Sequence, residues 1–145
     1  MTVQSILNTQ QQSNTSYIVP DATIAEALQS SGFEYAGAVV VSTDGITIQG
    51  ILTERDIVRG LRTVGAELLG GPVRDLMTAN VLTCEPSDRA AGIMALMASK
   101  HLRHVPVVLE GKLIGMVSVR DVLQLRLQEI LTEAQAMEKY IRGGS

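Results

Sequence analysis

The sequence states one short segment twice. Residues 50–56 read Gly-Ile-Leu-Thr-Glu-Arg-Asp, and residues 115–121 read Gly-Met-Val-Ser-Val-Arg-Asp. Apolar residues flank both copies, so each predicts a strand that runs through the glycine and turns into a helix at the hydroxyl residue. The first N–H groups of such a helix lack backbone partners and carry a partial positive charge, which suits an anion. The repetition therefore predicts two similar structural units with two related anion-binding junctions.

The hydroxyl residue and the aspartate three positions later have two interpretations in each copy. Thr53 with Asp56, and Ser118 with Asp121, are the residue types of a capping box, in which both side chains bond to the backbone of their own helix. The same pair also suits a nucleotide, because a hydroxyl binds a phosphate oxygen and a carboxylate accepts hydrogen bonds from ribose hydroxyls. The arginine before each aspartate favours the nucleotide, since the helix dipole disfavours a cation in the first turn by roughly 0.3–1 kcal/mol.

Composition argues against several classes of protein. The 145 residues form one domain of ordinary size, and 46% apolar against 3% aromatic residues predict an aliphatic core. The net charge of −3 and the lack of a Lys/Arg run argue against binding to nucleic acid or to an anionic membrane. The single Cys84 rules out an internal disulfide and a multi-cysteine metal site. No stretch reaches the roughly 18 apolar residues of a membrane span, and a signal-peptide profile is absent, so a cytoplasmic location is expected.

Apolar runs and turn residues predict the same order of elements in both halves of the chain. The order is β-α-β-β-α, so the expected fold is α/β (α+β) with one repeat at 15–69, a connector at 70–74 and a second repeat at 75–126. The first repeat is expected to contain a strand at 16–19, a helix capped by Asp21 or Thr23 and ended by Gly32, a strand at 36–41, a turn at 43–45, a strand at 46–52 and a helix at 54–64. The second is expected to contain a helical turn at 73–77, a strand at 81–83, a helix at 90–99 and strands at 105–109 and 113–117.

The two ends of the chain lie outside these repeats. Residues 1–14 are expected to be a flexible segment, although Val3–Leu7 could form one helical turn. The last helix is expected to run from Ser118 to about Ile141, so residues 127–145 form a helical extension and tail. Its apolar residues recur every three or four positions, and the second half has no partner within the repeat. We therefore expect a homodimer, with folding of the helix back onto its own domain as the alternative.

Four segments in this order resemble a tandem pair of CBS domains, the family named for cystathionine β-synthase. They are residues 50–56, 73–78, 103–108 and 115–121. The resemblance implies two repeats related by a pseudo-twofold axis. It also implies a cleft between them that binds AMP, ADP, ATP or S-adenosylmethionine as a regulatory ligand. Such pairs often dimerise.

The resemblance also implies which residues bind the nucleotide. Asp56 and Asp121 would hold ribose hydroxyls and Thr53 and Ser118 the phosphates, with Arg55 and Arg120 beside them. For the second site the resemblance adds Ser16, Ala36, Ala38, Ile114, Arg103 and His104. For the first site it adds Thr83, Val105, Pro106 and Ile48.

The two implied sites are not equivalent. Repeat 1 has Tyr35–Ala38 where repeat 2 has Arg103–Pro106, and in this alignment repeat 1 is two residues shorter before that strand. Arg103 and His104 would add positive charge to the second site. We therefore expect the second site to bind the nucleotide more tightly.

The remaining polar and sulfur-containing residues have plainer interpretations. His101 and His104 are three apart but lack a fixed-spacing carboxylate or a second cysteine, so a metal site is not favoured. His104 is instead expected to line the cleft or to end a helix. Met94, Met97 and Cys84 are expected to fill the core.

No pair of residues resembles a nucleophile with its base or a paired acid and base, so no catalytic site is predicted. The function expected is a non-enzymatic regulatory module that needs no obligatory cofactor, binds an adenine nucleotide and signals to another protein. One alternative is a structural or dimerisation module with a vestigial cleft. A second alternative is an enzyme that acts on nucleotides.

Overall fold

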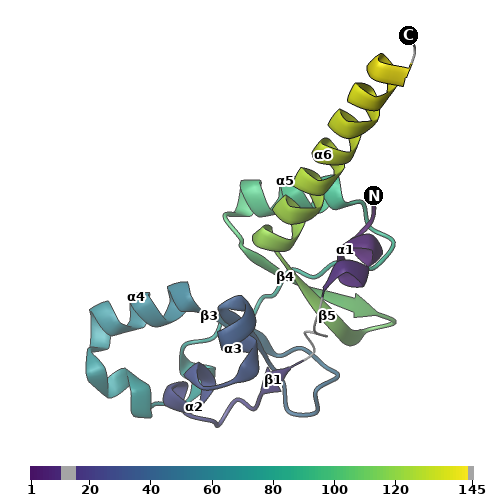
Figure 1. Cartoon of the computed structure of the whole chain (residues 1–145). Helices are drawn as coiled ribbons and strands as arrows, with labels where there is room; N and C mark the ends of the chain where they lie inside the picture. Colours follow the sequence, from purple (N-terminus) through teal and green to yellow (C-terminus); the bar gives the residue numbers. More distant parts are fainter. Residues whose placement is uncertain (11–15, 144–145) are drawn as a thin grey trace.

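The computed structural model describes residues 1–10 and 16–143 and has the two expected repeats, each with helices packed on a small sheet (Figure 1). The helices are α1 (Val3–Thr9), α2 (Ile24–Leu28), α3 (Ser31–Ala36), α4 (Glu54–Val64), η1 (Ala66–Gly70), η2 (Val73–Asp75), α5 (Ala90–Lys100) and α6 (Val119–Gly143). The strands are β1 (Tyr17–Ile18), β2 (Ala38–Val41), β3 (Gly50–Thr53), β4 (His104–Leu109) and β5 (Lys112–Ser118). The α+β class predicted from the sequence is confirmed.

The two sheets share one pairing pattern. In repeat 1, β1 runs parallel to β2, and β2 pairs antiparallel with β3. In repeat 2, β4 pairs antiparallel with β5, while Cys84 forms one parallel bridge to Val107 in place of a first strand. The prediction of a strand at 81–83 is therefore wrong, because this segment pairs with the sheet only at Cys84.

The strand register corrects the alignment of the two repeats. Ala38 lies opposite Thr53 in the first sheet, and His104 lies opposite Ser118 in the second. Ala38, rather than Ala36, is thus the counterpart of His104. Ala38 and His104 are 66 residues apart, and so are Pro20 and Pro86, which follow the first strand segment of each repeat. Repeat 1 is therefore not shorter than repeat 2 before its second strand.

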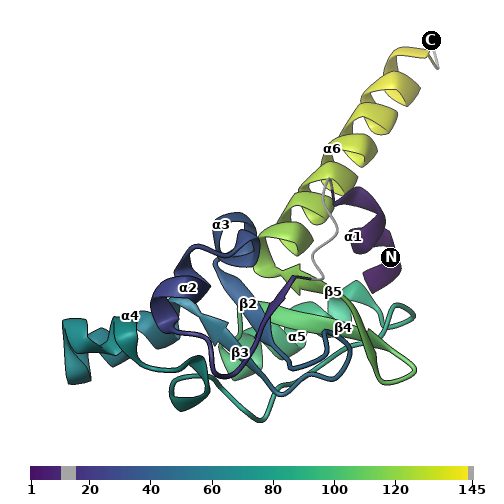
Figure 2. The same cartoon turned by 90° about the horizontal axis from the view of Figure 1, so that it is seen from below.

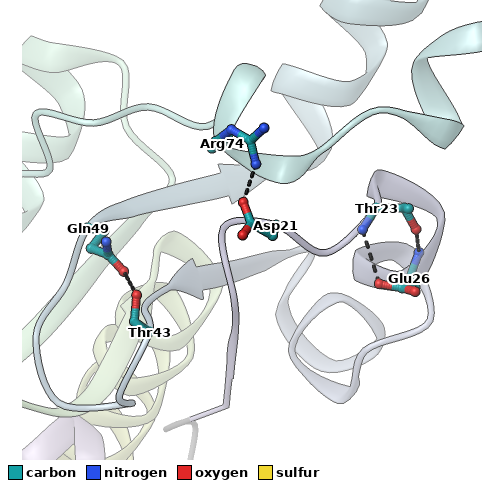
Figure 3. A network of polar contacts seen from close by, with 6 residues as sticks. All are labelled: Asp21, Thr23, Glu26, Thr43, Gln49 and Arg74. Atoms are coloured by element: carbon teal, nitrogen blue, oxygen red, sulfur yellow. Dashed lines mark hydrogen bonds and ion pairs between the residues drawn. The ribbon is translucent and has the colours of Figure 1, made fainter.

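Repeat 1 has two short helices where one was expected. Thr23 caps α2 through a capping box with Glu26, as Figure 3 shows. The helix ends at Leu28 because Ser30 then caps α3, so the predicted end at Gly32 is wrong. Gly37 ends α3 with φ of 71°, a left-handed conformation that favours glycine. The following strand therefore begins at Ala38 instead of at residue 36.

Polar contacts close the loops of repeat 1 (Figure 3). Arg74 of η2 forms an ion pair with Asp21, which ties the connector to the segment after β1, although both side chains are too exposed for a large stabilisation. Thr43 donates a hydrogen bond to Gln49 across the loop between β2 and β3. Because this loop occupies 42–49, the return strand starts at Gly50 and not at 46.

The N-terminal helix belongs to the core of repeat 2. Val3 and Ile6 are fully buried in a cluster that also contains Ala90 and Ile93 of α5. The expectation of a flexible segment is wrong for residues 3–9, and the alternative of a helical turn is correct and extends to Thr9. Residues 11–14 of the expected flexible segment lie outside the described residues.

The glycine that opens each repeated segment allows a close approach of another part of the chain. A Cβ atom at Gly50 would lie 2.6 Å from Sδ of Met77 and 2.9 Å from the carbonyl oxygen of Thr78. A Cβ atom at Gly115 would lie 3.0 Å from Cδ2 of Leu7. The segment at Met77 and Thr78 and helix α1 thus pack against equivalent strand positions in the two repeats.

Helix α6 leaves the domain after its first turns. Val122 is buried, whereas Leu127, Met137 and Ile141 are 57%, 63% and 70% exposed. The helix projects away from both repeats in two perpendicular views (Figures 1 and 2). The alternative in which it folds back onto its own domain is therefore wrong. In residues 1–10 and 16–143, no helix is both long and apolar enough to cross a bilayer.

Candidate functional site

Both repeated segments form the capping box that was one of their two interpretations. Thr53 N–H donates to Oδ2 of Asp56 over 3.0 Å, and Asp56 N–H donates to Oγ1 of Thr53 over 3.3 Å. Ser118 N–H donates to Oδ2 of Asp121 over 2.9 Å, and Asp121 N–H donates to Oγ of Ser118 over 3.1 Å. Each aspartate uses one carboxylate oxygen in its cap. Within the described part of the chain, Oδ1 of neither residue accepts a hydrogen bond.

A cavity of about 770 Å³ opens beside the second cap, and we name it the Ser118 cavity. Its walls come from the ends of α1 and α3 and from the starts of α4, β4 and α6. The lining residues are Thr9, Gln10, Phe33, Glu34, Tyr35, Ala36, Gly37, Glu54, Arg103, His104, Ser118, Val119, Arg120, Asp121 and Gln124. The lining thus contains two arginines and three carboxylates.

A smaller cavity of about 230 Å³ lies beside the first cap, and we name it the Thr53 cavity. Its walls come from β3, the start of α4 and the end of α5. The lining residues are Gly37, Ile51, Thr53, Glu54, Arg55, Asp56, Arg59, Thr78, Lys100, His101, Leu102, Arg103 and His104. Four Arg and Lys residues are set against two carboxylates, so this cavity is the more positive of the two.

Four residues line both cavities and form the wall between them. They are Gly37, Glu54, Arg103 and His104. Glu54 N–H donates to the Gly37 carbonyl over 3.1 Å, and the equivalent Val119 N–H donates to the Arg103 carbonyl over 2.9 Å. Glycine is favoured at position 37 in this wall by its left-handed φ of 71°, and the Glu54 carboxylate lies close to it.

His104 joins the two repeats directly. Its Nε2 atom donates a hydrogen bond to the Ala36 carbonyl, since a carbonyl only accepts. Burial lowers the pKa of the imidazole, which outweighs the opposite effects of the Ala36 hydrogen bond and of the Glu54 and Asp121 charges. A neutral His104 therefore sits between the cavities at neutral pH.

The two first-turn arginines differ in their surroundings. Arg55 donates through Nη1 to the carbonyl of His101 over 3.2 Å, at the end of α5, where a cation is favourable. Its presence in the first turn of α4 is thus explained in part without a bound anion. Arg120 makes no hydrogen bond or ion pair with any described residue, and it lines the Ser118 cavity.

Gln10 occupies one edge of the Ser118 cavity. Its Nε2 donates to the Met116 carbonyl over 2.8 Å and to Oδ2 of Asp121 over 3.2 Å. The end of α1 therefore contacts the aspartate that was expected to hold a ribose.

Comparison with known proteins decides the family. The CBS domain family model matches the chain twice, at residues 12–63 and 73–128. The chain belongs to the CBS-domain family. It is a tandem pair of CBS repeats, as the resemblance implied.

Several relatives share the CBS pair. The CBS domain-containing protein CBSX3, mitochondrial, of Arabidopsis thaliana is 34% identical over 128 residues, which cover 86% of this chain and 62% of that protein. An uncharacterised protein of Methanopyrus kandleri is 33% identical over 105 residues, 72% of this chain and 54% of its own length. The chain thus spans between about half and two thirds of these curated relatives.

Solved CBS structures have the same fold. The CBS-domain containing protein ATU1752 from Agrobacterium tumefaciens is 33% identical, with a TM-score of 0.80 and coverage of 87% of this chain and 99% of that one. The structure of CBSX2 in complex with AMP is 24% identical, with a TM-score of 0.68 and coverage of 88% and 96%. At that identity the second likeness concerns the fold alone.

The structure groups nine of the predicted site residues around the two cavities. Ala36, Ser118, Arg120 and Asp121 line the Ser118 cavity, Thr53, Arg55 and Asp56 line the Thr53 cavity, and Arg103 and His104 line both. Whether these residues bind a nucleotide stays a prediction.

Seven residues that the CBS resemblance suggested line neither cavity. Ala38, Val105 and Pro106 are buried strand residues, and Ala38 packs with Ile51 and Met116 between the repeats. Ser16 lies against α3, where its Oγ would be 2.6 Å from a Cβ atom at Gly32. Ile114 packs against the core of repeat 2, Ile48 belongs to the 42–49 loop, and Thr83 is exposed.

The cavities also contain residues that the sequence analysis missed. Arg59 lies one helical turn after Arg55, so their spacing of four predicts a shared face of α4. Lys100 directly precedes His101 at the end of α5. Phe33 and Tyr35 are two of the four aromatic residues in the chain, and both line the Ser118 cavity. Gln10 had no such signal, because its position depends on the tertiary packing of α1.

The remaining candidates are core residues. Met97 and Cys84 are buried, and Met94 packs against the same core of repeat 2. Burial raises the pKa of the Cys84 thiol to about 12, so this cysteine is unreactive at neutral pH. Among the described residues, no three His, Cys, Asp or Glu side chains are grouped so as to hold a metal ion.

Proposed function

We propose that the protein is a non-enzymatic regulatory module that binds an adenine nucleotide between its CBS repeats and signals the bound state to a partner protein. The observation that supports this most is the Ser118 cavity. Its volume of about 770 Å³ falls within the roughly 300–1,000 Å³ of small-molecule sites. It also combines a helix N-terminus, a carboxylate with one oxygen left over from its cap, and two arginines.

The proposed pose follows from the polar groups of this cavity. Oδ1 of Asp121 would accept hydrogen bonds from the ribose, while Arg120 and Arg103 would contact phosphate. Tyr35, which is 40% exposed in the cavity wall, offers a ring on which a base can stack. The fold is also that of CBSX2, which was crystallised with AMP.

The Thr53 cavity supports a different role. At about 230 Å³ it is smaller than most small-molecule sites, and its excess of cations suits phosphate groups more than a whole nucleoside. We propose that this cavity binds the phosphates of a ligand such as ATP and contributes less to the binding of AMP. This reverses the expectation that the second site is the more cationic one.

One observation favours the structural alternative. Asp56 and Asp121 both form complete caps without a ligand, so their presence has a sufficient explanation in helix stability. In that case the cavities would be vestigial and the module would serve dimerisation only.

Thermal unfolding with AMP, ADP, ATP, S-adenosylmethionine and NAD distinguishes the two functions. A ligand at about 100 times its dissociation constant stabilises the folded state by roughly 2.7 kcal/mol, which raises the melting temperature by roughly 5–10 °C. Calorimetry on any ligand that shifts melting then gives the stoichiometry. If all five leave the melting temperature unchanged at millimolar concentration, the structural function replaces the regulatory one. Product formed from labelled nucleotide would instead identify an enzyme.

A further inference from the structure

Helix α6 exposes an apolar stripe along the part that extends beyond the domain. Val119, Val122 and Leu125 pack against repeat 2, but the helix continues to Gly143. The stripe consists of Leu123, Leu127, Ile130, Ala134, Met137 and Ile141, all of them exposed. Beyond its first turns, α6 projects away from the other elements of the domain (Figures 1 and 2). Exposed apolar surface of this extent usually marks an interface.

The spacing of the stripe specifies the kind of surface that covers it. Successive members are four, three, four, three and four residues apart, which is a seven-residue repeat. Such a repeat keeps a straight seam only when two helices wind around each other. The stripe also lies about a quarter turn away from the residues that face the core. A second helix, rather than the rest of the domain, is therefore the surface that fits.

We propose that the stripe is covered by α6 of a second copy of this chain, running antiparallel. In this register Leu127 faces Met137 of the partner subunit, Ile130 faces Ala134 of the partner subunit, and Leu123 faces Ile141 of the partner subunit. All six members of each stripe are then paired. This proposal is independent of nucleotide binding.

The residues beside the stripe favour the antiparallel arrangement. In a parallel pair, Glu133 would face Glu138 of the partner subunit twice, once on each side of the seam. In the antiparallel register, Gln124 faces Glu138 of the partner subunit, and Leu131, which is 53% exposed, faces its own copy. Only Glu133 then meets a like charge. Antiparallel pairing thus removes one repulsion and buries two more leucine side chains.

An apolar cavity at the base of α6 gives a second, separate reason. The cavity of about 180 Å³ lies between α5 and α6 and is lined by Met94, Ala98, Leu102 and Leu123, among other apolar residues. Leu123 also begins the stripe. In the antiparallel register, Ile141 of the partner subunit lies against Leu123 and covers this cavity. In a parallel pair the two Ile141 ends would meet each other and leave the cavity open to water.

The interface is tested by one charge at the middle of the stripe. Sedimentation should show the wild-type chain at twice its mass of 15.5 kDa at micromolar concentration. Ile130→Glu should raise the dimer dissociation constant at least about 100-fold, because a carboxylate in the seam would lose its water. Thr132→Glu adds the same charge on another exposed face and should leave the dimer unchanged. A monomeric wild type, or a dimer that survives Ile130→Glu, would overturn the proposal.

The direction of pairing is tested by cysteine cross-linking. Leu127→Cys and Met137→Cys are oxidised separately and as a mixture, while the buried Cys84 stays in place. Antiparallel pairing predicts a disulfide-linked dimer in the mixture alone, since residue 127 then faces residue 137 of the other chain. Cross-linking of either variant by itself indicates parallel helices and overturns the register. Absence of a cross-link in all three samples overturns it as well.

Discussion

The Ser118 cavity and the Thr53 cavity begin from the same local structure and end with different walls. Both open at a strand-to-helix turn with the same cap, and both share the wall formed by Gly37, Glu54, Arg103 and His104. The Ser118 cavity has about 770 Å³ and more carboxylates than arginines, whereas the Thr53 cavity has about 230 Å³ and an excess of cations.

The difference comes from elements that lie outside the repeated segments. Helix α3 contributes Glu34 and Tyr35 to the Ser118 cavity, and Gln10, directly after α1, adds an amide. With Ala38 equivalent to His104, α3 corresponds to the end of α5 in repeat 2. The end of α5 contributes Lys100 and His101 to the Thr53 cavity. A repeated motif thus supplies two caps, while the neighbouring helices set the volume and charge of each site. Four experiments test whether the cavities also differ in what they bind.

The largest effect is expected from removing two cations that only the Thr53 cavity has. Arg55→Ala combined with Arg59→Ala should lower the affinity for ATP at least about 100-fold, because each hydrogen bond to a charged phosphate contributes roughly 1.5–3 kcal/mol. Calorimetry measures the loss. Arg120→Ala is the matched control in the Ser118 cavity and should cost less than about tenfold. Because Arg55 also bonds to His101, melting without ligand checks that the fold is intact. Equal losses of affinity would contradict a division of ligands by charge.

The two aspartates should separate ligand binding from capping. Asp121→Ala should lower the affinity for AMP at least about tenfold, since Asp121 is half-buried beside the larger cavity. Asp56 is only 8% exposed beside the smaller cavity, so Asp56→Ala should affect AMP less. Both variants should lose about 0.5–2 kcal/mol of unfolding free energy through the lost cap. Calorimetry and urea unfolding are measured on each. Stability loss with unchanged affinity in both variants would support the structural alternative.

A smaller effect, in the opposite direction, is expected at the edge of the Ser118 cavity. Gln10→Ala should raise the affinity for AMP about threefold, because Gln10 holds Oδ2 of Asp121 and its contact must be broken or rearranged on binding. Gln4→Ala is a suitable control, since Gln4 lies on the exposed side of the same helix. The affinities are compared by calorimetry. A weaker binding of AMP by Gln10→Ala would instead make Gln10 a ligand contact.

Local elements were predictable from the sequence where their signals were local. The turns at Thr53 and Ser118 depend on residues within four positions, so the strand ends and the helix starts there were predicted to within one residue. The end of the first helix was wrong because Gly32 and Ser30 both signal a boundary, and the serine caps a new helix two residues before the glycine.

Features that depend on distant contacts were predicted less well. The helical spacing of Val3 and Ile6 is visible, but only the packing of α5 and β5 shows that repeat 2 needs α1 to complete its core. The strand offset between the repeats likewise required the pairing of Ala38 with Thr53 and of His104 with Ser118. Of the site residues that the family resemblance implied, those at the caps line the two cavities, whereas buried strand residues such as Val105 face the core. Their binding of a nucleotide stays a prediction.

The smallest effect is expected from the histidine in the wall that the two cavities share. Burial holds the pKa of His104 below its ordinary value near 6.5, against the charges of Glu54 and Asp121 and with that of Arg103. Well above pH 6.5 the histidine is neutral in the folded and unfolded chains, so its contribution is constant. As the pH falls through 6.5, the unfolded chain gains a proton that the folded chain does not, and stability decreases. Urea unfolding between about pH 7.5 and pH 5.5 should therefore show a greater loss for the wild type than for His104→Gln, which keeps a donor for Ala36. A bound phosphate in either cavity would favour the protonated ring and reduce this loss, so repeating the titration with AMP and with ATP shows which ligand lies closer to the shared wall. Identical pH profiles for the two proteins would mean that His104 does not titrate differently on folding.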